Sequence, residues 1–251
     1  MDISMWALAV IAVVVLVGAT LQRVSGMGLG LIGAPVLSML VGPVAGVIII
    51  NVLAAANAVF QSVAVRRGID WRQFRWIAPM MVVGAVPVAF LVHTLPTGPL
   101  QILVGTLVLA GLLVTTYMPH QRRISGRGYA MAAGAAGGAM NTIAGIAGPA
   151  ITVYAQASRW PQRTFAPTLQ PLFVVSGVVS LLAKELTAGE SIVAGAPWHL
   201  WPIGVAMMLS GLWIGNRLAD VVPMAKARRL AVAVAGAGAL VTLVRGTLEV
   251  L

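Results

Sequence analysis

Hydrophobic segments separated by short polar connections make up almost all of the chain. Their lengths and apolar content predict ten helical segments, at residues 5–24, 27–41, 44–65, 74–95, 99–118, 128–146, 148–158, 164–184, 198–219 and 229–248. A helix of about 20 apolar residues spans the hydrocarbon core of a bilayer, and several of the segments reach that length. The pattern therefore predicts an all-α, polytopic membrane protein.

Two of these segments, 27–41 and 148–158, are too short for an ordinary membrane crossing. Each follows a glycine-rich stretch, the first running from Gly18 to Pro35 and the second from Gly137 to Ile151. Glycine allows backbone angles that other residues avoid, and proline ends or kinks a helix. Irregular backbone at membrane depth needs protein or a water-filled cavity around it. We therefore expect each stretch to break a helix into a bent or re-entrant hairpin, with the two breaks facing each other.

The two glycine-rich stretches belong to a longer internal repeat. Later in the chain the offset between matching residues is 127, because the connection Lys184–Pro197 is longer than its counterpart, and Met80–Gly84 then pairs with Met207–Gly211. We expect one integral membrane domain built from two repeats of about five hydrophobic segments each, residues 1–119 and 128–251. Before that connection an offset of 119 pairs Gly18 with Gly137, Gln22 with Asn141, Gly26 with Gly145, Asn51 with Gln170, and Asn57 with Ser176.

Charge is unevenly distributed, with 16 lysine and arginine residues against 6 aspartate and glutamate residues. Most basic residues gather in the four stretches Arg66–Arg75, Arg122–Arg127, Arg159–Arg163 and Lys226–Arg229, whereas the other connections hold only Lys184. Cytoplasmic loops of membrane proteins carry such an excess, so no nucleic-acid partner is needed to explain it. The same rule places both termini outside the cytoplasm. Segments of one repeat then run opposite to their partners in the other, so we expect the repeats to be inverted.

The residue types that carry catalysis or bind metals are scarce. Cysteine is absent, and His93, His120 and His199 are scattered along the chain. No nucleophile–base pair or ligand cluster of the kind that enzymes need stands out. No acidic residue lies well inside a predicted segment, which argues against a carboxylate proton relay. We therefore expect no enzyme activity, no metal and no cofactor.

Facing helix breaks suit the binding of an anion. Short helices beginning near Gly28 and Ala147 present free N–H groups and about half a positive charge at their N-termini, and Arg23 adds a guanidinium that can hold two oxygens at once. The alternatives are that the glycines serve helix packing, that the amides only bond helices together, and that Arg23 extends to the membrane surface. The predicted substrate-binding residues are Gln22, Arg23, Ser25, Gly26, Gly28, Asn51, Asn57, Asn141, Thr142, Gly145 and Gln170.

Two motifs carry a resemblance to a known family. The stretch Ser25-Gly26-Met27-Gly28-Leu29-Gly30, followed by Pro35, resembles the glycine motif of the TauE/SafE sulfite exporter family, also called the 4-toluene sulfonate uptake permease family. The stretch Gly211–Leu218 resembles a late motif of the same family. The resemblance implies a bacterial inner-membrane protein that moves sulfite, sulfonates or related organic sulfur anions.

We therefore expect a secondary transporter, an exporter of small sulfur anions that works by alternating access. Inverted repeats and broken helices near the midplane are the usual plan of such transporters. An anion channel, a transporter of a small carboxylate, and a membrane scaffold or sensor component are the alternatives. The expected partners are the anionic substrate, the lipid bilayer and further copies of the chain in a homo-oligomer. Both termini are expected in the periplasm.

Overall fold

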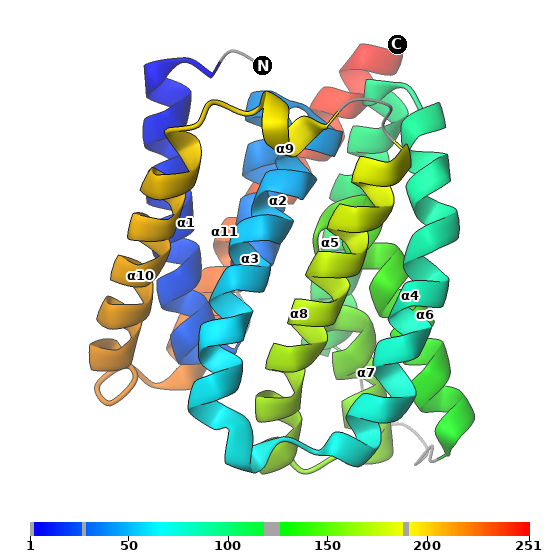
Figure 1. The fold of residues 1–251 in the computed structure, drawn as a ribbon, viewed down its shortest axis with the longest axis vertical. Helices are drawn as coiled ribbons and strands as arrows, with labels where there is room; N and C mark the ends of the chain where they lie inside the picture. The colour runs from blue at the N-terminus through cyan, green and yellow to red at the C-terminus, as the bar shows by residue number, and fades with distance from the viewer. Residues whose placement is uncertain (1–2, 27–28, 118–125, 188–190) are drawn as a thin grey trace.

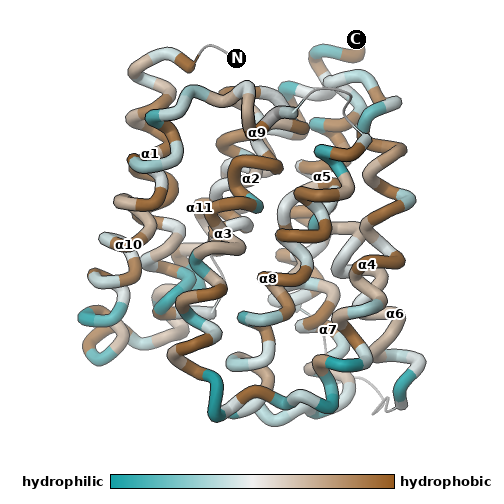
Figure 2. The backbone as a smooth tube through the Cα atoms, in the orientation of Figure 1, coloured by the Kyte–Doolittle hydropathy of each residue, from teal (hydrophilic) through white to brown (hydrophobic). Residues whose placement is uncertain are grey.

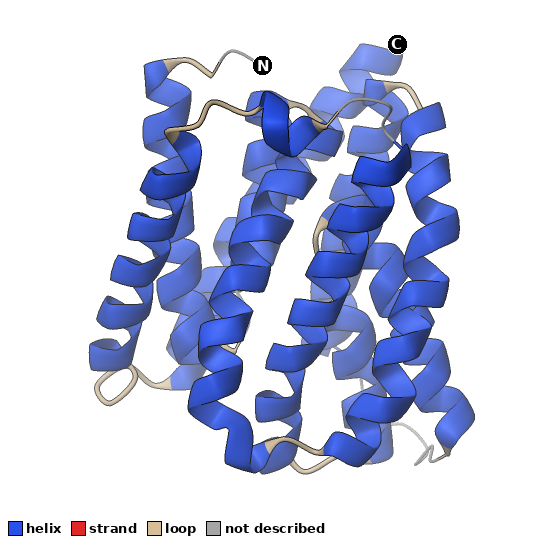
Figure 3. Ribbon diagram, viewed as in Figure 1, coloured by secondary structure: helices blue, strands red, loops and turns tan. Residues whose placement is uncertain are grey.

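The computed structural model describes residues 3–26, 29–117, 126–187 and 191–251. Within these ranges the regular elements are helices, and no strand occurs (Figure 3). The elements are α1 (Met5–Ser25), α2 (Leu29–Val41), α3 (Pro43–Val65), η1 (Arg66–Gly68), α4 (Trp71–Thr94), α5 (Thr97–Tyr117), α6 (Arg127–Ala144), α7 (Gly148–Ser158), α8 (Gln162–Thr187), α9 (Ile192–Gly195), α10 (Leu200–Leu218) and α11 (Met224–Val250).

The structure confirms the all-α class, and the chain is a multi-pass membrane protein. Figure 2 shows mostly hydrophobic residues along the middle of the bundle and hydrophilic residues gathered toward its ends. Such a distribution matches the apolar core and polar surfaces of a bilayer. Among the described residues, six helical stretches are long and apolar enough to span a membrane: Met5–Ser25, Pro43–Gly68, Trp71–Thr94, Thr97–Tyr117, Gln162–Thr187 and Met224–Val250.

All ten predicted segments correspond to helices, although some boundaries differ. Helix α4 begins at Trp71 because the Asp70 carboxylate accepts hydrogen bonds from the backbone N–H groups of its first turn. Helix α8 continues to Thr187, so the assignment of Lys184 to a connecting loop was wrong: the residue lies inside the helix and is buried. The short helix α9 lies within the connection that follows.

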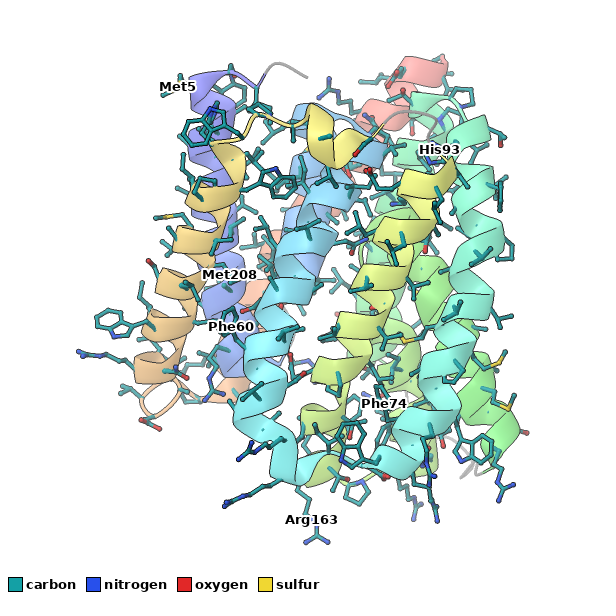
Figure 4. The ribbon with its side chains drawn as sticks, viewed as in Figure 1. Met5, Phe60, Phe74, His93, Arg163 and Met208 are labelled. Carbon is teal, nitrogen blue, oxygen red and sulfur yellow. The ribbon has the colours of Figure 1, made fainter. Side chains whose placement is uncertain are left out.

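The long helices run side by side between two ends of the bundle (Figure 1). Both chain termini lie at one end, which we call the terminal end. The opposite end, which we call the basic end, carries η1 and the exposed Arg163 (Figure 4). Helix α1 runs toward the basic end and α2 returns from it, whereas α6 runs toward the terminal end and α7 returns. The short helices α2 and α7 are largely buried.

Small residues allow the closest helix contact, between α4 and α6. A Cβ atom added at Gly84 would lie 1.9 Å from the Ala135 carbonyl oxygen, and one added at Gly138 would lie 2.0 Å from the Met81 carbonyl oxygen. No side chain fits in either space, so these glycines hold the two backbones together. For Gly138 the packing alternative raised from the sequence is therefore correct.

Candidate substrate-binding site at two helix breaks

Helices α1 and α6 end in the same way. Gly26 follows α1 with a φ angle of +79°, and its N–H donates to the Gln22 carbonyl oxygen at 2.8 Å. Gly145 follows α6 with a φ angle of +67°, and its N–H donates to the Asn141 carbonyl oxygen at 2.8 Å. Glycine adopts these left-handed angles without steric cost and is the usual residue at such helix ends. The sequence repeat pairs Gln22 with Asn141 and Gly26 with Gly145. In the structure both helices end with the same left-handed glycine and the same backbone hydrogen bond.

The two breaks contact each other. A Cβ atom added at Gly30, in the first turn of α2, would lie 2.4 Å from the Gly145 carbonyl oxygen. The backbone N–H of Leu29, which begins α2, donates to the Gln22 side-chain oxygen at 3.1 Å. Gln22 therefore joins the end of α1 to the start of α2, and Gly30 allows that start to lie against the other break.

A cavity of about 50 Å³ lies between these helix ends. The N-terminal turns of α2 and α7 both border it, and each helix N-terminus carries about half a positive charge on N–H groups that have no acceptor within the helix. At α2 the first of these, the Leu29 N–H, donates to Gln22. The described residues that line the cavity include no charged side chain, so its positive potential comes from the backbone. They are Gln22, Gly30, Leu31, Asn51, Ala54, Asn141, Gly145, Ile146, Ala147, Gly148, Pro149, Phe173, Ser176 and Gly177.

A chain of buried amides and a hydroxyl forms one wall of the cavity. The Asn141 amide nitrogen donates to the Asn51 side-chain oxygen at 3.2 Å and to the Ser176 carbonyl oxygen at 3.0 Å. The Asn51 amide nitrogen in turn donates to the Ser180 hydroxyl oxygen at 2.9 Å. These bonds connect α6, α3 and α8, so each amide is held in one orientation beside the cavity. Buried networks of this kind are rigid when their groups are paired.

Four predicted site residues therefore meet at this cavity: Gln22, Asn51, Asn141 and Gly145. The other buried candidates lie elsewhere. Thr142 donates its hydroxyl to the Gly138 carbonyl oxygen at 2.9 Å, within α6. Asn57 and Gln170 are buried away from the cavity, and both amide atoms of Asn57 and the side-chain oxygen of Gln170 have no hydrogen-bond partner among the described residues.

Arg23 lies on another face of α1. Its guanidinium Nε donates to the Asn216 side-chain oxygen on α10, and its stem packs beside Gly215. The structure thus places Arg23 in the contact between α1 and α10, and not among the residues lining the cavity. Ser25 and Gly26 line a different cavity, and Gly28 lies outside the described residues.

Two further cavities lie on the basic side of the breaks. One, of about 130 Å³, is lined by residues including Ser25, Thr152 and Arg228. The other, of about 660 Å³, lies at the basic end and is lined by four arginines, Arg72, Arg75, Arg127 and Arg159. Trp160 lines both cavities. Its ring packs against Tyr154 and Phe165, and its indole N–H donates to the Thr164 hydroxyl at 3.1 Å. Its side chain therefore lies between the two spaces.

Several residues of the site were not among the sequence candidates. Ser176 belongs to the sequence repeat and Gly30 to the first glycine-rich stretch, so the sequence already pointed to both residues. Ser180 and Gly148 carried weaker signals, a lone hydroxyl and the second glycine run. Small residues in apolar helices commonly serve packing alone, so only the fold assigns Gly30, Gly148 and Ser176 to the cavity wall and Ser180 to the hydrogen bond behind Asn51.

Comparison with known proteins gives one family. A family model described as Sulfite exporter TauE/SafE matches residues 10–242. Searches of curated proteins and of solved structures give no significant match.

Proposed function

Since the chain belongs to the TauE/SafE sulfite exporter family, we propose that it is a secondary transporter that exports a small sulfur oxyanion, such as sulfite, across a bacterial inner membrane. The family match covers nearly the whole chain and supports transport rather than catalysis. An inside-negative potential favours outward movement of an anion by about 2.3 kcal/mol per charge per 100 mV, which suits export.

One observation carries the proposed binding site: two helix N-termini and a wall of amides converge on a small buried cavity. Helix N-termini bind oxyanions through backbone N–H groups and the helix dipole. A buried water needs about 10–15 Å³ of such space, so a cavity of about 50 Å³ has room for roughly three to five water-sized groups. Sulfite has one sulfur and three oxygens. The size therefore favours sulfite over an aryl sulfonate.

The proposed mechanism is alternating access between two inverted repeats, residues 1–119 and 128–251. The opposite directions of the α1–α2 and α6–α7 pairs support the inversion (Figure 1). The cavities on the basic side support access from the cytoplasm, because arginine-rich ends of membrane proteins face that compartment. Both termini would then lie in the periplasm. Rocking of one repeat against the other would open the central cavity to each side in turn.

Thermal stability of the purified protein with added sulfite tests this site. A ligand that binds only the folded state at 100 times its Kd stabilises that state by about 2.7 kcal/mol. We expect sulfite to raise the melting temperature of wild type, and toluene sulfonate and acetate to raise it less. The substitutions Asn51→Leu and Asn141→Leu keep the side-chain size but remove the amides, so they should reduce the shift.

Asn216→Leu is the matched control, because Asn216 is exposed and lies outside the cavity. Its sulfite shift should equal that of wild type. A larger shift with acetate than with sulfite would instead favour a carboxylate transporter. Flux of sulfite from proteoliposomes that saturates with concentration distinguishes a transporter from a channel or a membrane scaffold.

A further inference from the structure

Lys184 is the feature that the proposed site does not explain. Only three residues of α8 follow it, so its long side chain could reach the membrane surface, as lysines near helix ends usually do. Instead the residue is 0% exposed, and its amine has no hydrogen-bond partner among the described residues. Ionisable side chains inside a membrane are costly, and those that persist commonly mark a substrate or ion pathway.

Lys184 continues a polar line that starts at the central cavity. Ser176 lines the cavity, and Ser180 and Lys184 follow it at intervals of four residues, so the three lie on one face of α8. Ser180 accepts the hydrogen bond from Asn51 at 2.9 Å. Because Cα–Cβ bonds tilt toward a helix N-terminus, the Lys184 side chain leaves α8 in the direction of Ser180. The line therefore runs from the cavity toward the terminal end.

The charged groups near Lys184 do not provide a counter-ion within the described part of the chain. Helix α3, which packs against α8, has no ionisable residue. On α4 the nearest is His93, whose ring Nε2 lies 3.1 Å from the Lys184 carbonyl oxygen. Glu185 points to the following segment, where its carboxylate accepts from the Ser191 hydroxyl at 2.5 Å and from the Val193 N–H at 3.1 Å. Of the other helices against α8, η1 carries Arg66 and Arg67 at the basic end, and α6 carries Arg127 and Tyr129 in its first turn there. Tyr154 of α7 bonds to Gln73.

We propose that Lys184 is a second anion-binding residue, which binds the sulfur oxyanion between the central cavity and the terminal end. The inference rests on the proposed transport of an anion. The substrate supplies a negative charge that no described residue provides around the amine. The central cavity offers the anion backbone dipoles and amide groups but no charged side chain among its described lining residues, so an ammonium group further along α8 would draw the anion outward.

The substitution Lys184→Met tests this role, because methionine is apolar and close to lysine in length. Removing an unpaired buried charge should leave the melting temperature without ligand unchanged or higher. The concentration of sodium sulfite that gives half of the maximal thermal shift should rise at least tenfold. Sulfite efflux from proteoliposomes should fall by a similar factor.

Lys226→Met is the matched control, because Lys226 is the other lysine in the chain and is exposed near the basic end. It should leave both the thermal shift and the efflux at wild-type values. Glu190→Gln is a second control. Glu190 lies outside the described residues, and its substitution should also leave sulfite binding unchanged.

Four outcomes would overturn the inference. A Lys184→Met protein that fails to fold, or melts at a lower temperature, would show that the amine has a structural partner. Unchanged sulfite affinity in Lys184→Met would remove the residue from the pathway while leaving the central site in place. Tighter sulfite binding in Glu190→Gln would show that this carboxylate is the counter-ion of the amine and competes with the anion for it. Absence of any sulfite shift in wild type would refute the proposed function itself, and the inference with it.

Discussion

The contact between Gly30 and the Gly145 carbonyl oxygen depends on the absence of one side chain. A Cβ atom at Gly30 would lie 2.4 Å from that oxygen, so the two breaks could not keep their present distance. We predict that Gly30→Val lowers sulfite efflux at least tenfold and destabilises the protein by about 1–3 kcal/mol, the usual cost of overpacking. Efflux and thermal melting of the purified variant measure the two effects.

Gly128→Ala is the control for this substitution. Gly128 is exposed in the first turn of α6, and a Cβ atom there would meet nothing within 4 Å. Alanine favours helix by about 0.5–1 kcal/mol over glycine in a helix interior, so stability should be unchanged or slightly raised. Normal efflux in Gly30→Val would contradict the requirement for close contact between the breaks.

Arg23 gives a second prediction at this scale. Because it bonds to Asn216 and does not line the cavity, Arg23→Gln should leave sulfite affinity unchanged. It should lower stability by about 1–2 kcal/mol through loss of the hydrogen bond between α1 and α10. Titrations of the thermal shift with sulfite measure both quantities. A tenfold loss of sulfite affinity in Arg23→Gln would show that Arg23 contributes to the binding site.

The sequence predicted four residues of the cavity wall because repeat pairing and buried amides both point to them. It could not separate Gln22 from Arg23, which are neighbours in the chain. Consecutive helical residues point about 100° apart, so at most one of them faces a small cavity. Helix packing decides which one, and packing depends on side chains far away in the sequence, such as Gly215 and Asn216 on α10.

At the scale of elements, the end of α7 stands between two cavities. Trp160 lines both the cavity near Thr152 and the larger one at the basic end. The preceding Arg159 has a φ angle of +54°, an unusual value for a residue with a side chain. This short helix end therefore places an indole ring between the two cavities, where the proposed alternating access requires an inner gate.

Cysteine labelling tests this gate, because the chain contains no native cysteine. We predict that a cysteine at Thr152 reacts slowly with a membrane-impermeant thiol reagent, and several times faster when Trp160→Ala is also present. A cysteine at Ser158, which lines the larger cavity, should react at the same rate with and without Trp160→Ala. Equal rates for Thr152→Cys in both backgrounds would show that Trp160 does not separate the cavities.

Hydrophobic length predicted every long helix, since apolar runs of sufficient length have few alternatives in a bilayer. The end of α8 was harder to place. Lys184 resembles a loop residue in sequence, because lysine is rarely buried inside a membrane helix. The Lys184 side chain is buried by the packed ends of other helices, which is a tertiary effect that the residues around it in the sequence do not predict.

The whole molecule presents two chemically different ends, and this gives a prediction about orientation. Four arginines line the cavity at the basic end, whereas both termini lie at the other end (Figure 1). In intact bacterial cells a cysteine at Ser4 should react with an impermeant thiol reagent, and one at Gln162 should not. In inside-out vesicles the pattern should reverse. Labelling of both positions from the same side would contradict the proposed topology.

The central claim is that a sulfur oxyanion binds where the two helix breaks meet. Selenite, the heavier analogue of sulfite, tests it directly, because the anomalous scattering of selenium locates the anion in a crystal of the protein. The account predicts a selenium peak between the N-terminal turns of α2 and α7, beside Asn51 and Asn141. A peak only among the arginines of the basic end, or none at that cavity in protein that selenite stabilises against heat, would contradict it.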